Sequence, residues 1–128
     1  MQYLKSMVWV PIILLGLIGT ALAHEAGLEA RIRAQNTSGQ TTTYNLDNLP
    51  PEAQIQSVEV VGMFSTGEPM ANAQVSIYAP GEPATPWRTG QSDRQGRYSF
   101  TPDLSKRGRW TVRFESMGHS SIINIPVR

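Results

Sequence analysis

GQSDRQGRYSF, residues 90–100, is the stretch of this chain that decides its fold class. Asp93 can accept hydrogen bonds from backbone amides two or three residues further on, and Gly96 can take the positive φ that closes a hairpin. Tyr98 and Phe100 then point to one face of the strand that follows, because side chains alternate along a strand. The stretch therefore predicts a tight β-turn that leads into a short strand.

Similar alternating segments recur on both sides of this turn, separated by Gly, Pro, Asn and Asp residues, as in all-β sandwiches. A threonine-rich segment at 40–46 adds a further strand only if it pairs at a sheet edge. The pattern predicts one all-β domain, a β-sandwich of seven to eight strands. Its expected core contains Val58, Val75, Ile77, Phe100, Trp110 and Val112. The expected strands are 28–35, 40–46, 57–64, 73–79, 87–91, 98–100, 110–114 and 122–127.

The first 23 residues have the three parts of a secretory signal peptide. Lys5 supplies the positive charge, residues 7–18 the apolar segment, and Ala21-Leu22-Ala23 the cleavage site. An uncleaved membrane anchor is the alternative, but the apolar run is shorter than the ~20 residues that a spanning helix needs. We expect cleavage before His24 and export to a bacterial periplasm, with membrane association only if the signal stays uncleaved.

Composition limits what the remaining chain can be. Removal of residues 1–23 leaves 105 of the 128 residues, enough for one domain. We divide it into an N-terminal part with one or two strands, 24–54, and the sandwich core, 55–128. Without Lys5 the basic and acidic residues balance, which argues against nucleic-acid binding. The absence of cysteine excludes disulfides and thiolate metal ligands.

Several motifs between 58 and 127 occur in the order seen in a known superfamily. They are AQVSIYAP at 73–80, Asp93-x-x-Gly96-Arg97-Tyr98, Gly108-Arg109-Trp110 and Met117-Gly118-His119. On these motifs the chain resembles the carboxypeptidase regulatory-like, transthyretin-like sandwiches. It is most similar to small exported accessory proteins of bacterial nickel and cobalt uptake transporters, which also tend to begin with histidine after processing. The resemblance implies a metal-linked role beside an inner-membrane uptake transporter.

The two histidines bear on whether the protein is an enzyme. Acyl transfer needs a nucleophile, a base and a group that orients the base. His24 and His119 are the only imidazoles, and neither lies in a recognisable nucleophile motif. His119 and Ser120 are adjacent at the start of a strand, so they point to opposite faces. We therefore predict a protein without catalytic activity.

The same histidines are candidate metal ligands. The α-amine and ring Nδ1 of a mature N-terminal His24 can chelate one cation, and such nitrogen donors suit nickel, cobalt(II), copper(II) and zinc. His119 can add a second imidazole, and Met117 a thioether that favours copper(I). The alternatives are a hydrogen-bonded hairpin histidine and a methionine that packs over the hairpin. The sequence thus predicts a non-enzymatic accessory that binds or presents a divalent transition metal, which the resemblance implies is nickel or cobalt. The alternative is a metal-free interaction or structural domain of the cell envelope.

The shared site requires His24 and His119 to lie at the same end of the sandwich. Seven strands running alternately up and down satisfy this condition. An extra strand at 40–46 would place the two histidines a strand length apart, ~17–20 Å, unless the connection through Pro50-Pro51 crosses back over the sheet.

Overall fold

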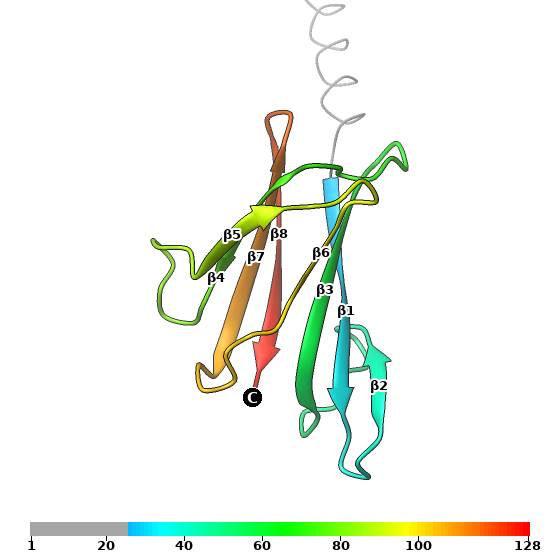
Figure 1. Cartoon of the computed structure of the whole chain (residues 1–128), viewed down its shortest axis with the longest axis vertical. Helices are drawn as coiled ribbons and strands as arrows, with labels where there is room; N and C mark the ends of the chain where they lie inside the picture. The colour runs from blue at the N-terminus through cyan, green and yellow to red at the C-terminus, as the bar shows by residue number, and fades with distance from the viewer. Residues whose placement is uncertain (1–25) are drawn as a thin grey trace, which may run out of the picture.

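The computed structural model describes residues 26–128, which form eight strands (Figure 1). The strands are β1 Ala26–Gln35, β2 Thr41–Tyr44, β3 Gln54–Phe64, β4 Gln74–Tyr78, β5 Arg88–Gln91, β6 Arg97–Phe100, β7 Gly108–Ser116 and β8 His119–Val127. They build two antiparallel sheets, ordered β2-β1-β3-β6 and β5-β4-β7-β8. The predicted β-sandwich is confirmed, with the threonine-rich segment as edge strand β2. The predicted signal peptide lies outside the described residues.

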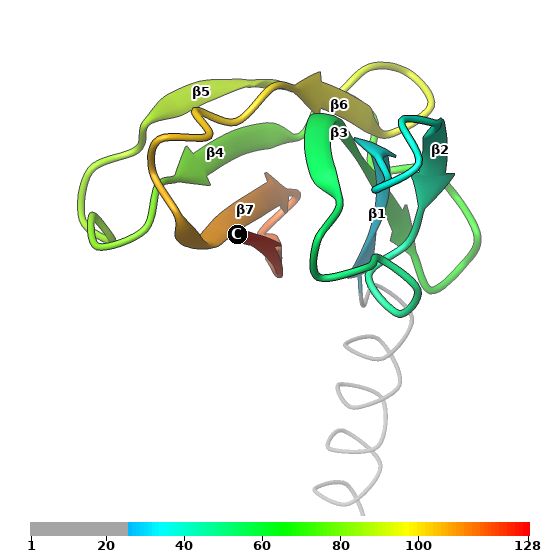
Figure 2. The ribbon, with the colours of Figure 1, turned by 90° about the horizontal axis from the view of Figure 1, so that it is seen from below.

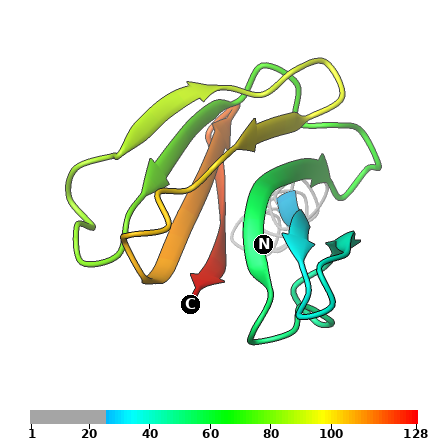
Figure 3. The ribbon, with the colours of Figure 1, turned by 60° about the horizontal axis from the view of Figure 1, so that its bottom comes forward.

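The two sheets pack face to face, as two views show (Figures 2 and 3). Along one side β5 lies beside β6, where a Cβ added to Gly90 would come within 2.6 Å of the Tyr98 ring. On the other side β1 packs across β8. β2 and β6 are the edge strands of their sheet, and the threonines of β2 are exposed.

The core fills the space between the sheets. All six residues predicted for it are buried: Val58, Val75, Ile77, Phe100, Trp110 and Val112. Trp110 is the largest of the fully buried side chains. Its indole Nε1 donates a hydrogen bond to the Lys106 carbonyl at 2.8 Å. Trp87 packs edge-on against it with ring centroids 4.9 Å apart, so this half-buried tryptophan is part of the packing.

The turn between β5 and β6 forms where the sequence predicts it, although the second amide bonded to the Asp93 side chain lies four residues on and not three. Asp93 Oδ1 accepts hydrogen bonds from the amides of Gln95 and Arg97, both at 2.9 Å. Gly96 has φ +75°, and a Cβ there would overlap the Gly62 carbonyl oxygen. Because the Gly62 amide also donates to the Gly96 carbonyl at 2.8 Å, the turn is held directly against β3.

One buried hydroxyl links this turn to the start of β4. Ser92 is only 2% exposed, and its Oγ accepts a hydrogen bond from the Ala73 amide at 2.8 Å. The same hydroxyl donates to the Met70 carbonyl at 2.5 Å. The buried hydroxyl of Ser92 therefore both donates and accepts a hydrogen bond, as burial away from water requires.

The connection between β2 and β3 determines whether the start of β1 and the β7–β8 hairpin lie at the same end of the sandwich. β2 and β3 each pair antiparallel with β1, so they run parallel to one another. The chain must therefore return along the sheet through residues 45–53, which include Pro50-Pro51. The extra strand β2 alone would place the start of β1 and the β7–β8 hairpin at opposite ends of the sandwich. The return through residues 45–53 reverses the chain direction once more and removes this effect. As a result β1 begins at the end of the sandwich where the β7–β8 hairpin lies (Figure 1).

The first prediction concerns Trp110. Truncation to alanine, W110A, should lower the free energy of unfolding by about 3–5 kcal/mol, because it leaves a cavity between the sheets. Urea denaturation measures this loss. W87A is the matched control, and its cost should be smaller because Trp87 is only half-buried. Near-wild-type stability of W110A would show that the core does not depend on this indole.

The second prediction concerns acid stability. Hydrogen bonds from the Ser105 hydroxyl and then its amide, with Lys106 nearby, lower the pKa of Asp103 below its ordinary value of 3.8. The folded state thus favours the carboxylate, so its stabilisation is present above that value and is lost as pH falls through the lowered pKa. Urea unfolding of wild type and D103N, compared at about pH 5 and about pH 2.5, should show a steeper acid loss in wild type. Equal losses would contradict this contribution.

Candidate functional site

The β7–β8 hairpin carries two of the three predicted metal ligands. Ser116 pairs with His119, so the loop consists of Met117 and Gly118 alone. Their φ angles are +53° and +78°, the left-handed pair that a type I′ hairpin turn requires. The Met117 side chain is 80% exposed at the tip. Met117 therefore does not pack over the hairpin, which was the alternative to a binding role.

The backbone conformation of Met117 is unfavourable for its residue type. Only Asn72 and Met117 have positive φ among the non-glycine residues of 26–128, and asparagine tolerates that region well. A methionine there costs on the order of 1–2 kcal/mol. Burial does not offset this cost, since the side chain is exposed. Strain retained at an exposed position is typical of residues kept for binding.

His119 is the first residue of β8 and is half-buried. It shares the alternating face of β8 with Ile123, Ile125 and Val127, which pack toward the opposite sheet. Ser120 lies on the other face, where its Oγ accepts a hydrogen bond from Arg113 Nε at 3.0 Å. His119 therefore faces the sheet that contains β1, while its neighbour Ser120 faces solvent.

β1 enters the sandwich at this same end. Its first residue, Ala26, pairs with Phe64 at the end of β3. A shallow hollow of about 250 Å³ adjoins this point and is lined partly by Met63, whose side chain is 41% exposed. Sequence reasoning missed Met63. Its outward position in an otherwise apolar strand is the signal that could have identified it.

His24, the third predicted ligand, lies outside the described residues. Within 26–128, no group of three or more His, Cys, Asp or Glu side chains could hold a metal ion. Within these residues the hairpin contains two of the three predicted ligands, Met117 and His119.

Comparison with known proteins adds no relative: no protein-family model, curated protein or solved structure matches the chain. Across residues 26–128, no helix has the length and apolar character needed to cross a membrane.

The third prediction follows from the strain at Met117. The variant M117N should have a free energy of unfolding about 0.5–1 kcal/mol higher than wild type, because asparagine suits the left-handed turn position. Urea denaturation measures this gain. M117A keeps the strain while removing the thioether, and serves as the control. A destabilised M117N would mean that the methionine side chain contributes to folding, which its exposure argues against.

Proposed function

We propose that the processed protein is a non-enzymatic periplasmic accessory that binds a divalent transition metal ion, nickel or cobalt, and presents it for uptake. The observation that carries the proposal is the shared end of the sandwich. Because residues 45–53 return along the sheet, β1 starts beside the hairpin, and His119 faces the sheet to which β1 belongs. The proposal requires cleavage before His24.

The donor set fits such an ion in number and type. The α-amine and imidazole of a terminal His24 would provide two nitrogen donors, and His119 a third. Nitrogen ligands lie ~2.0–2.1 Å from a zinc-like ion, so the donor atoms must come within roughly 3–4 Å of each other. Met117 at the tip offers a thioether, which would raise the affinity for copper(I) rather than for nickel.

The resemblance supports the wider setting of this proposal. Two four-stranded antiparallel sheets are compatible with a carboxypeptidase regulatory-like, transthyretin-like sandwich. The predicted signal peptide would support export, and the resemblance to metal-linked accessory proteins suggests an inner-membrane uptake transporter as partner. In that setting the protein would deliver the ion as cargo from the hairpin end.

A second candidate is a metal-free interaction domain of the cell envelope. It is favoured by the exposed apolar side chains of Met117 and Ile122, which are 80% and 59% exposed on the same hairpin. A protein partner that covers both would explain why the strained methionine is retained. Metal affinity separates the two candidates.

The fourth prediction tests the metal site by calorimetry with nickel, cobalt and copper on protein that begins at His24. H119A should weaken nickel or cobalt binding at least about tenfold, because loss of a ligand removes one of few donors. A serine added before His24 should do the same by displacing the α-amine.

The matched control for that extension is a serine added after Arg128, at the opposite end of the sandwich, which should leave the affinity unchanged. Wild-type affinity in both H119A and the N-terminally extended protein would leave the interaction domain as the better account.

A further inference from the structure

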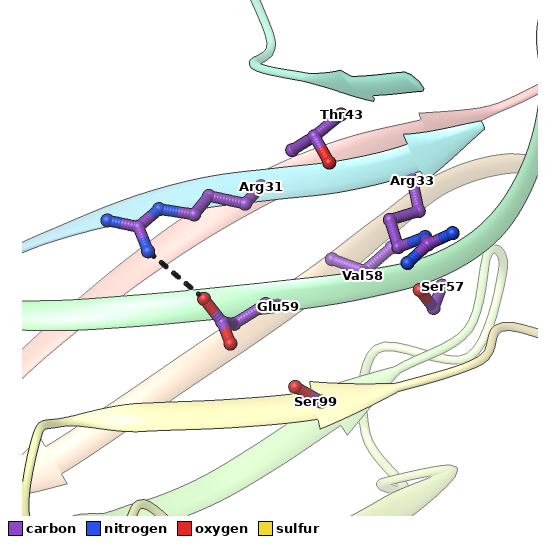
Figure 4. A pocket seen from close by; sticks show the side chains of 7 residues that line it. All are labelled: Arg31, Arg33, Thr43, Ser57, Val58, Glu59 and Ser99. Atoms are coloured by element: carbon purple, nitrogen blue, oxygen red, sulfur yellow. Dashed lines mark hydrogen bonds and ion pairs between the residues drawn. The ribbon is translucent and has the colours of Figure 1, made fainter. Parts of the chain in front are cut away.

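A second hollow lies on the outer face of the sheet β2-β1-β3-β6, away from the core (Figure 4). It has a volume of about 250 Å³ and is called the arginine hollow below. Four strands contribute to it, so its shape is set by the pairing of the whole sheet. Its lining residues are Arg31, Arg33, Thr43, Ser57, Val58, Glu59 and Ser99.

The charges in the arginine hollow do not cancel. Arg31 Nη1 lies 3.4 Å from Glu59 Oε1, its cross-strand neighbour. Arg33, two residues along the same face, makes no ion pair or hydrogen bond through its guanidinium within residues 26–128. The hollow therefore has a net charge of +1, carried by a planar group with five N–H donors.

Two hydroxyls flank this arginine in register. Arg33 pairs with Thr43 on β2 and with Ser57 on β3, so the three side chains form one row across the sheet. Neither hydroxyl makes a hydrogen bond to another group of residues 26–128. In Figure 4 the Arg33 guanidinium extends over β3 toward Ser57. Potential donors from three neighbouring strands thus line the same hollow.

The strand pairing is irregular at this point. Arg33 pairs with Ser57, but the next residue, Ala34, pairs with Ile55, so Gln56 is an extra residue on β3. A β-bulge of this kind turns nearby side chains away from the regular direction, and bulges are frequent beside binding sites. The bulge thus sets the local direction of the side chains at this end of the hollow.

We propose that the arginine hollow binds a carboxylate group, with Arg33 as the bidentate partner and the hydroxyls of Ser57 and Thr43 as additional donors. The fork of a guanidinium matches the two oxygens of a carboxylate. A single negative charge balances the net charge of the hollow. The carboxylate of Glu59 repels any anion in this hollow, and it repels a doubly charged phosphate more strongly than a singly charged carboxylate. The site is independent of the hairpin, because Arg33 is near the opposite end of β1.

The test is an NMR titration with sodium acetate, run against sodium chloride at equal ionic strength. Acetate should shift the Arg33 Nε–H and the amides of 56–58 with saturation in the millimolar range. R33Q should weaken this binding about tenfold, and R33K should not restore it, since lysine lacks the fork. R97Q is the matched control: Arg97 is exposed on β6 of the same sheet but does not line the hollow.

The carboxylate could come from the C-terminus of a protein or from a small organic acid, and further titrations separate these two sources. Acetylated diglycine with a free terminus is compared with its amide and with acetate. Tighter binding of the peptide acid assigns the site to a protein terminus, and equal binding of acid and acetate assigns it to a small acid. Binding of the amide as strong as that of the acid, an equal loss in R97Q, or tighter binding of sulfate than of acetate would overturn the proposal.

Discussion

The structure depends on the placement of one indole ring between its two sheets. Trp110 is fully buried near the start of β7 and packs against Phe100 on the facing sheet, with ring centroids 6.4 Å apart. Its polar atom is satisfied by the Lys106 carbonyl, so the ring is buried without an unpaired donor. Because β7 pairs with β8 along its whole length, fixing Trp110 also fixes the strand pair that presents the hairpin at its far end.

Local patterns were sufficient to predict most of the fold. Alternation identified the strands and the six core residues, and Asp93 with Gly96 identified the β5–β6 turn. The sequence left the return of residues 45–53 open as one of two alternatives, because the choice depends on whether β2 and β3 both pair with β1. The bulge at Gln56 and the pairing of Arg31 with Glu59 were missed for the same reason: both arise from non-local register.

The sequence predicts which residues belong to the candidate site, but it does not predict their backbone conformation or the direction of their side chains. Met117 and His119 were identified from the sequence, but the strain at Met117 was not, since Met-Gly lacks the asparagine that normally announces a type I′ turn. The face to which His119 points follows from the alternation of side chains along β8. It could not be predicted without knowing that β8 begins at His119. His24 lies before the described residues, so its role remains a proposal.

We propose that one metal ion binds at the end of the sandwich where β1 starts and the β7–β8 hairpin lies. Paramagnetic broadening by substoichiometric cobalt(II) in a ¹⁵N–¹H spectrum of the processed protein tests it most directly. The amides of 26–28 and 117–121 should broaden first, while the turn at 103–106, at the opposite end of the sandwich, should stay sharp. Broadening centred elsewhere, or none at millimolar cobalt, would contradict it.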